Sequence, residues 1–453
     1  MQIELIFYVS PWRNIVEMII FLLGVLLLGV VNADVRVFFN KTEIEVHMDN
    51  TVFIPFTIEN LSSDVRNVNI TAVSSNLNVV QVNVSNFDPF LISNGIYKGI
   101  VNVSAIFLGN AEVYLSVFIE RKWVKSDVIN VIIIRRVRII DHVFTGSIAL
   151  LVSILYINFG CAIDWDVCTK TIKRPIGPLI GCVCQFVLMP LISYTLGLLL
   201  FPDSPEMQLG IFFTGISPSG GASNIWSMLL GGNLNLSVTM TTLCTIAAFG
   251  LMPMWIFTLG KHIFERGNLT MPYDKVATFA IGLIIPLALG YIIQKKLPRL
   301  SRFMVRTMKP FSVILIVFII IFAIVTNVYL FKLFSWKIIL AGMGLPWLGF
   351  LIGIAIAFIC RQPNQDIRAI AIETGIQNTG VAIFLLRFSL KQPAADLTTV
   401  IPVSCAIMTP MPLAVLYIIK LVLDRRKSNI INSREKLQNH QAATASTPLP
   451  LED

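Results

Sequence analysis

Two short stretches of the chain combine oxygen-bearing side chains with residues that interrupt helices. Residues 217–224 read Ser-Pro-Ser-Gly-Gly-Ala-Ser-Asn, and residues 373–380 read Glu-Thr-Gly-Ile-Gln-Asn-Thr-Gly. Carboxylate, amide and hydroxyl oxygens are hard ligands, which suit an alkali ion better than zinc or copper. Unwound backbone adds carbonyls that can bind a cation, and helix N-termini favour an anion. Sodium fits this chemistry, and proton coupling through Glu373 is the alternative.

Both stretches interrupt segments long enough to cross a membrane. From residue 143 to residue 423 the chain repeats apolar runs of roughly 20 residues, the length that spans a bilayer core. Nine spans are predicted, near residues 143–162, 176–200, 207–230, 235–260, 276–294, 310–331, 338–360, 368–390 and 398–423. The interrupted third and eighth spans are five apart and therefore run in opposite directions. Paired, interrupted helices of this kind point to a transporter's site near the middle of the membrane.

Glu373 is the only acidic residue predicted to lie well inside a span. An ionisable group there costs at least ~2.5 kcal/mol on insertion scales, so a compensating partner is expected. No Lys or Arg lies deep within a predicted span to pair with it, which favours a coordinated cation. Enzyme activity within the membrane is not expected, because Glu373 has no nucleophile and base beside it.

The composition independently indicates a membrane protein. Of the 453 residues, 55% are hydrophobic and only 13% are charged, against about 25% charged in an ordinary soluble domain. The net charge of +9 reflects basic loops beside spans rather than a nucleic-acid surface. The largest such loop contains Lys295, Lys296, Arg299, Arg302, Arg306 and Lys309. Basic loops of this kind face the cytoplasm, which predicts an extracellular N-terminus and a cytoplasmic C-terminus.

Different segments flank the spans. Residues 1–33 are predicted to be a signal peptide, with an uncleaved signal anchor as the alternative. Residues 34–135 alternate apolar and polar residues between turn signals, which predicts an extracellular β-sandwich-like domain of roughly 100 residues. Five glycosylation sequons in this domain begin at Asn40, Asn60, Asn69, Asn83 and Asn102. Residues 424–453 start basic, turn polar and are predicted to form a disordered cytoplasmic tail.

Five motifs along the spans occur in the order found in a known family. They are residues 159–164 (FGCAID), 185–190 (QFVLMP), 218–224 (PSGGASN), 235–242 (NLSVTMTT) and 373–378 (ETGIQN). This set resembles the sodium/bile acid cotransporters, and specifically the branch with an extracellular N-terminal domain. The resemblance covers residues 143–423. It implies a polytopic α-helical fold of nine transmembrane helices, with inverted repeats and two crossed broken helices.

The resemblance also implies which residues bind the cargo. Two sodium ions would be carried as coupling ions, and no cofactor is implied. One ion would take Ser223, Asn224, Ser237, Thr241 and Glu373. The other would take Gln185, Gln377 and Glu373, with the backbone carbonyls of Thr374 and Ile376. An organic anion, such as a bile acid, a steroid sulfate or a smaller amphipathic carboxylate or sulfate, would contact Asn224 and Asn378. Many relatives carry Thr where this chain has Gly221, a departure that removes one polar contact and leaves the choice of anion open.

Other interpretations of these residues remain at this point. The β-domain could bind an extracellular protein partner, with the membrane domain as a non-transporting anchor. An anchor, however, needs neither nine spans nor a full set of oxygen ligands. Ser237 and Thr241 lie one helical turn apart and could bond only to their own helix, while Gly220 and Gly221 could simply allow close helix packing. The secretory route predicts a multi-pass protein of the plasma membrane.

Overall fold

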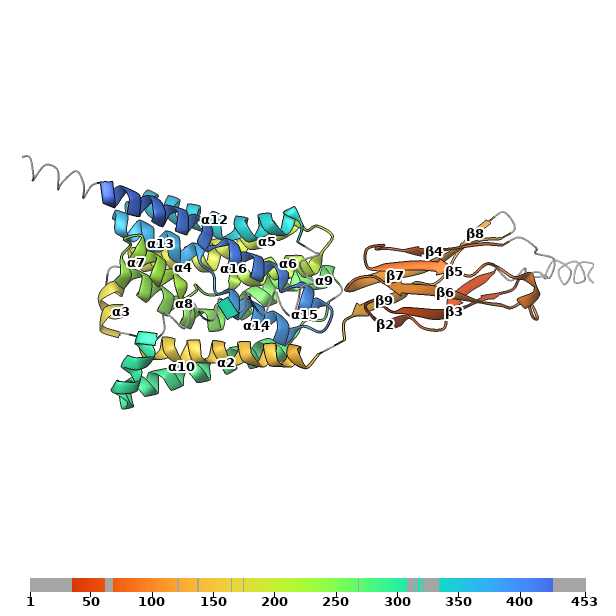
Figure 1. Cartoon of the computed structure of the whole chain (residues 1–453), viewed down its shortest axis with the longest axis horizontal. Helices are drawn as coiled ribbons and strands as arrows, with labels where there is room; N and C mark the ends of the chain where they lie inside the picture. The colour runs from red at the N-terminus through yellow and green to blue at the C-terminus, as the bar shows by residue number, and fades with distance from the viewer. Residues whose placement is uncertain are drawn as a thin grey trace, which may run out of the picture. The chain divides into compact units, whose positions relative to one another are not determined.

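The computed structural model describes most of the chain. The described residues are 35–61, 68–119, 122–136, 138–163, 165–173, 175–267, 269–307, 314, 317, 318, 321 and 334–426. The predicted signal peptide, most of the sixth predicted span and residues 427–453 of the predicted tail lie outside them. The chain divides into two compact units, Met1–Arg136 and Val137–Asp453. Figure 1 shows the elements of both units, and each unit is described separately below.

The first unit contains two β-sheets. One has the strand order β1-β3-β6-β5, and the other has the order β2-β9-β7-β4, with β8 beside β7. The strands are β1 Arg36–Phe39, β2 Glu43–His47, β3 Thr51–Glu59, β4 Asn69–Ser74, β5 Val80–Val84, β6 Tyr97–Ala105, β7 Gly109–Ile119, β8 Lys122–Lys125 and β9 Ile129–Ile134. A short 3-10 helix, η1, spans Pro89–Leu91. The pairing is antiparallel except between β2 and β9, which run parallel.

Alternation along the strands explains how the sheets pack. In β7 every second residue from Gly109 to Ile119 is buried, because successive side chains point to opposite faces of a sheet. The inner faces of both sheets contribute to one apolar core, for example Val101 from one sheet and Val113 from the other. The β-rich N-terminal domain that the alternation predicts is therefore present.

A predicted turn of this unit also forms as its residues dictate. Asn94 and Gly95 both have positive φ angles, of 53° and 73°. They connect Ser93 and Ile96, whose backbone groups exchange hydrogen bonds of 3.0 and 2.9 Å. Asn-Gly is the pair that tolerates this mirror-image turn with least strain.

The second unit is helical. Its helices are α2 Ile139–Ala162, α3 Trp165–Ile172, α4 Ile176–Val183, η2 Cys184–Leu188, α5 Met189–Leu200, α6 Pro205–Ile216, α7 Ala222–Leu229, α8 Leu234–Trp255, η3 Ile256–Gly260, α9 Lys261–Arg266, α10 Tyr273–Lys296, α12 Trp336–Ile359, α13 Asn364–Gly375, α14 Thr379–Ser389, α15 Ala394–Leu397 and α16 Val400–Met408. Residues 298–307 and 410–426 are also helical.

Within the described residues, six helical segments are long and apolar enough to cross a membrane. They are Ile139–Ala162, Ile176–Leu200, Leu234–Arg266, Tyr273–Lys296, Trp336–Ile359 and Ala394–Arg426. These six coincide with six of the predicted spans. The third and eighth predicted spans are each divided into two short helices, α6 with α7 and α13 with α14. Because most of the sixth predicted span is not described, the count of nine spans stays a prediction.

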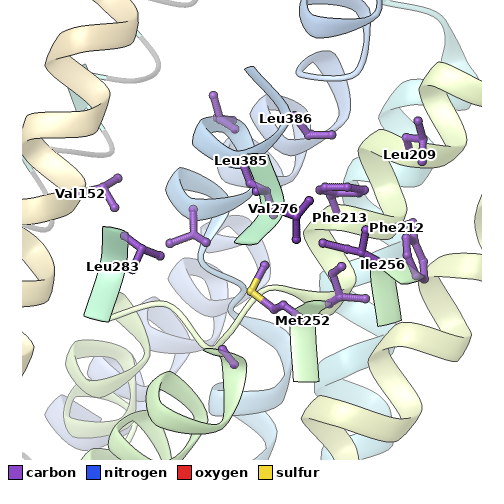
Figure 2. Packing of buried hydrophobic residues seen from close by; sticks show 14 of the residues in the cluster. Val152, Leu209, Phe212, Phe213, Met252, Ile256, Val276, Leu283, Leu385 and Leu386 are labelled. Carbon is purple, nitrogen blue, oxygen red and sulfur yellow. The ribbon is translucent and has the colours of Figure 1, made fainter. Parts of the chain in front are cut away.

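A large apolar core joins helices that are distant in the sequence. Figure 2 shows Phe212 and Phe213 of α6, Met252 of α8, Val276 of α10 and Leu385 of α14 pointing toward one another. The core therefore packs α10 and one half of each interrupted span against α8. This packing fixes α6, which leads into the first break, and α14, which follows the second break.

Helices α2 and α10 lie side by side and approach very closely (Figure 1). A Cβ atom at Gly160 would lie 2.2 Å from the carbonyl oxygen of Leu287, and one at Gly290 would lie 2.1 Å from that of Ile157. Only residues without a side chain allow backbones to approach this closely, as is common between membrane helices. The two helices therefore form one tightly packed pair beside the rest of the unit.

Candidate cation and anion site

The break between α6 and α7 lies against the break between α13 and α14. The Gly220 amide donates to the Ile376 carbonyl at 2.9 Å, and the Asn378 amide donates to the Pro218 carbonyl at 2.8 Å. These bonds pair the two breaks as a short antiparallel ladder. Backbone groups freed by a broken helix need partners where water is absent, and here each break supplies partners for the other.

Gly220 is required for this close approach. A Cβ atom at this position would lie 2.9 Å from the carbonyl oxygen of Gln377. The neighbouring Ser219 hydroxyl also crosses between the breaks, since it donates to the Glu373 carbonyl at 2.9 Å and to the Ile376 carbonyl at 3.3 Å. The two breaks thus share a defined hydrogen-bonded centre.

Glu373 lies beside this centre and is 1% exposed. The Thr241 hydroxyl donates to one of its carboxylate oxygens, and the Ser237 hydroxyl donates to the other at 3.0 Å. The Ser237 hydroxyl also lies 2.8 Å from the side-chain oxygen of Asn224, whose nitrogen donates to Thr241 at 3.2 Å. We call Asn224, Ser237, Thr241 and Glu373 the carboxylate cluster. Four residues of the first predicted sodium set are therefore in mutual contact.

Ser223 and a second contact of Thr241 also belong to the description of this cluster. The fifth residue of the set, Ser223, is buried, and its hydroxyl finds no hydrogen-bond partner among the described residues. The Thr241 hydroxyl also contacts the Ser237 carbonyl of its own helix at 3.0 Å. The single hydroxyl proton of Thr241 is therefore shared between the Glu373 carboxylate and the Ser237 carbonyl, so Thr241 contacts the site as well as its own helix.

The side chains that donate hydrogen bonds to the Glu373 carboxylate in this structure are neutral. Within the described ranges, Glu373 forms no ion pair with a Lys, Arg or His side chain. The Ser237 and Thr241 hydroxyls that donate to this buried carboxylate keep lone pairs on their own oxygens. Such a set is complementary to a small cation with hard-ligand preference.

A second group of polar residues lies on the other side of the break in α13 and α14. The Gln185 amide nitrogen donates to the side-chain oxygen of Gln377 and to the Ser217 carbonyl, both at 2.7 Å. The Gln377 amide nitrogen donates to the Thr374 carbonyl at 2.7 Å. We call Gln185, Gln377 and the carbonyls of Thr374 and Ile376 the amide cluster. It gathers the remaining residues of the second predicted sodium set.

A π-helical turn presents Gln185 to this cluster. The turn η2 contains Gln185 and is followed directly by α5, whose second residue is Pro190. Proline has no N–H to donate to the carbonyl four residues earlier, that of Phe186. The indole nitrogen of Trp255 donates to that carbonyl instead, at 2.8 Å. The sequence thus loosens the helix at the point where its polar side chain enters the site.

Asn378 caps the N-terminus of α14 beside the break. Its side-chain oxygen accepts from the Val381 amide at 3.2 Å, while its side-chain nitrogen is buried and has no partner within the described part of the chain. An unsatisfied donor at a helix N-terminus is suited to an anionic oxygen. Gly221, at the start of α7, is half-buried.

A small cavity adjoins the carboxylate cluster. It has a volume of about 20 Å³ and lies between α2, α8 and α10, with Asn224 and Thr241 among its polar lining and Phe159 and Leu287 among its apolar lining. Sites for small organic ligands usually measure about 300–1,000 Å³. The cavity is therefore much smaller than such a site in this structure.

The structure also contains a buried charge pair that the sequence reasoning missed. Arg387, in the last turn of α14, lies 3.1 Å from Asp396, and their side chains are only 6% and 0% exposed. The guanidinium also lies over the Phe144 ring of α2, 4.9 Å from its centre. Glu373 is therefore not the only buried acid of the helical unit. The available signal was the opposite charges of Arg387, near the end of the eighth predicted span, and Asp396, in the short loop that follows it.

The sequons of the first unit lie on accessible strands and turns. Asn40, Asn60, Asn69 and Asn83 are exposed, and Asn102 is half-buried. Asn83 on β5 and Asn102 on β6 are directly opposite each other in the register. The structure places these side chains at the surface of the unit, and their glycosylation stays a prediction.

Comparison with known proteins identifies the family that the helical unit matches. Residues 149–333 match the sodium bile acid symporter family. The rabbit (Oryctolagus cuniculus) ileal sodium/bile acid cotransporter is 30% identical over 266 residues, which are 58% of this chain and 74% of that protein. The chain belongs to the sodium/bile acid symporter family. The members of that family are transporters rather than enzymes, in agreement with the sequence prediction.

Other members of the sodium/bile acid symporter family share the same region. The human "P3 protein" is 31% identical over 256 residues, which are 56% of this chain and 54% of that protein. The bovine (Bos taurus) sodium-dependent organic anion transporter is 32% identical over 257 residues, or 55% of this chain and 66% of that protein. The chain thus spans about half the length of the P3 proteins that it matches.

Proposed function

We propose that this chain is a sodium-coupled symporter of an organic anion. The observation that carries the proposal is the carboxylate cluster, in which a buried acid, without a cationic partner among the described residues, is surrounded by three neutral oxygen-bearing side chains. A sodium ion coordinated there would balance the charge of Glu373. Family membership supports the same cargo, since two of the relatives are named as sodium-dependent carriers of bile acids or organic anions.

A second sodium ion would bind at the amide cluster. Its carbonyls are already occupied by N–H donors, so the Gln377 amide has to turn and present oxygen instead of nitrogen. Such a turn would break the Gln377 bond to Thr374 and alter the Gln185–Gln377 pair. The second ion would therefore follow a local rearrangement. Both ions are cargo in this scheme, and no other cofactor is proposed.

The anion would bind beside the crossing of the interrupted helices. The unsatisfied nitrogen of Asn378 would donate to a carboxylate or sulfate oxygen, and Asn224 would link the anion to the carboxylate cluster. The apolar residues around the small cavity suit an amphipathic body such as a steroid. Separation of the α2–α10 pair from the rest of the unit would open this space and give alternating access at the plasma membrane.

Thermal unfolding of the purified full-length protein in sodium or choline chloride tests the cation site. Sodium at ten times its dissociation constant stabilises a protein by about 1.4 kcal/mol, so the melting temperature is expected to rise in sodium only. Glu373→Gln is expected to lose this rise. Glu265→Gln, which alters an exposed acid paired with Lys261 on α9, is the matched control and should retain it.

Uptake of radiolabelled steroid sulfates and bile acids by cells that express the protein tests the anion. Uptake is expected with external sodium and not with choline, and Glu373→Gln is expected to abolish it at equal surface expression. A protein that is stabilised equally by sodium and choline, and that carries none of these anions, would contradict symport. That result would favour a receptor whose β-domain binds an extracellular partner.

A further inference from the structure

A second, larger cavity lies at one end of the helical unit and shares Ala162 and Ile163 with the lining of the small cavity. Its volume is about 570 Å³, and it is formed by the C-terminal ends of α2 and α10, the start of α3 and the helical residues 298–307. The basic loop after the fifth predicted span contributes to its wall. Neither sodium set nor the proposed anion contacts account for this cavity.

The lining of the cavity is strongly basic. Lys295, Arg302 and Arg306 line it together with one carboxylate, that of Asp166, which leaves an excess of two positive charges. All three basic side chains are exposed. A hollow of this volume is in the range of small-molecule sites, and its charge selects an anionic group.

Two polar residues hold the wall of the cavity in place. The Gln294 amide nitrogen donates to the carbonyls of Cys161 and Ile163, and the Ser301 hydroxyl donates to the Cys161 carbonyl at 3.3 Å. These bonds tie the end of α10 and residues 298–307 to the end of α2. The three basic residues therefore lie on helices that are hydrogen-bonded to the end of α2, and not on an irregular loop.

Large apolar side chains lie next to the basic ones. Leu297, Leu300 and Phe303 are 53%, 42% and 60% exposed. Leu300 and Phe303 share the helical residues 298–307 with Arg302 and Arg306, which makes this segment amphipathic. Exposed apolar residues beside basic ones at a span end are typical of a membrane interface. A soluble anion would not contact these apolar side chains, whereas the acyl chains of a lipid would.

We propose that this cavity binds the headgroup of an acidic phospholipid that carries a phosphomonoester, such as a phosphorylated phosphatidylinositol. The phosphate oxygens would accept hydrogen bonds from Arg302, Arg306 and Lys295. The acyl chains would lie along Leu300 and Phe303. The volume of about 570 Å³ accommodates a sugar-sized headgroup rather than a phosphate alone. This proposal does not depend on sodium or anion transport.

Binding to lipid nanodiscs tests the proposal with the full-length protein. Nanodiscs of phosphatidylcholine would contain 5% phosphatidylinositol 4-phosphate or, at matched charge, phosphatidylserine, and lipids retained after detergent extraction would be identified by native mass spectrometry. The phosphoinositide is expected to be retained preferentially. Arg302→Gln with Arg306→Gln should reduce its retention roughly tenfold. Lys295→Gln alone should reduce it about fivefold.

Arg425→Gln with Arg426→Gln is the matched control. These arginines are exposed, lie at the end of the last helix, and are predicted to face the same side of the membrane. The control pair should leave retention within about twofold of the unchanged protein. Equal losses from both pairs would show diffuse charge attraction and overturn the site. Full competition by soluble inositol 1,4-bisphosphate at the affinity of the lipid would also overturn it, in favour of a free anion.

Discussion

The carboxylate cluster and the amide cluster contact the same broken backbone but present different surfaces to a cation. In the carboxylate cluster, hydroxyl donors point at Glu373 and their oxygens keep lone pairs free for an ion. In the amide cluster, the Thr374 and Ile376 carbonyls already accept N–H or O–H donors. The first cluster is therefore organised in advance, whereas the second has to release donors. We expect sodium to bind the carboxylate cluster first and more tightly.

Gly220→Ala should have the largest effect, because it would affect both clusters. The added Cβ would lie 2.9 Å from the Gln377 carbonyl oxygen, which should destabilise the protein by about 1–3 kcal/mol and remove sodium-dependent stabilisation. Thermal unfolding with and without sodium measures both.

Gly250→Ala is the control for the glycine substitution. A Cβ at Gly250 in α8 would meet no atom within 4 Å, so this change should be neutral or stabilise the helix by about 0.5–1 kcal/mol. A Gly220→Ala protein that binds sodium normally would show that the close contact of the two breaks is dispensable.

Thr241→Val should weaken the carboxylate cluster by roughly tenfold or more in sodium affinity. The change keeps the shape of the side chain but removes a hydroxyl that bonds to a charged group. Sodium titration of the melting temperature measures the affinity. Thr242→Val is the matched control, since within the described residues the Thr242 hydroxyl donates to the Val238 carbonyl of its own helix and not to Glu373. Equal shifts from both variants would remove Thr241 from the cation site.

Gln377→Leu should affect only the second ion. The sodium dependence of uptake is expected to change from a slope near 2 toward 1 on a Hill plot, with about a tenfold rise in the sodium needed for half-maximal rate. Gln208→Leu provides a control, because Gln208 is buried at the start of α6 and bonds to the Phe201 carbonyl outside both clusters. An unchanged slope in Gln377→Leu would mean that the amide cluster binds no coupling ion.

Ser223→Ala should have the smallest effect. The Ser223 hydroxyl makes no hydrogen bond within the described residues, so stability without sodium should change by less than about 0.5 kcal/mol. Sodium affinity should fall about threefold, because one neutral ligand is lost. Ser227 lies one turn further along α7, is equally buried and is likewise without a partner. Ser227→Ala should therefore leave sodium affinity unchanged, and a reversed result would exclude Ser223 from the ligand set.

The sequence predicted the elements better than their contacts. Hydrophobic length located the long helices, and proline and glycine located both breaks, because these signals act within a few residues. Residue types alone identified Glu373 as an acid predicted to lie well inside a span. Its contacts with Ser237 and Thr241, however, were predicted only from a family resemblance. Contacts between residues more than a hundred positions apart leave no local pattern to read.

Two features show where sequence reasoning stopped. The Arg387–Asp396 pair depends on how α15 folds back on α14, which residue spacing does not specify. The π-helical turn at Gln185 depends on the Trp255 indole reaching the Phe186 carbonyl from another helix. In the first case the fold of a short loop decides the contact, and in the second case a residue of another helix does. The basic loop was interpreted as a topology signal alone, and its amphipathic helix became visible only with the exposed side chains in place.

The paired backbone of the two breaks has a consequence for how the chain is made. The residues around Gly220 need the carbonyl of Ile376, which lies roughly 155 positions later in the chain. At about 5–20 residues per second of synthesis, the first interrupted helix would wait on the order of 10–30 s before its partner emerges from the ribosome. During that interval its unpaired backbone has to be accommodated by water, by lipid headgroups or by the insertion machinery. Residues 217–221 are therefore a segment that other molecules can bind before assembly in the membrane is complete.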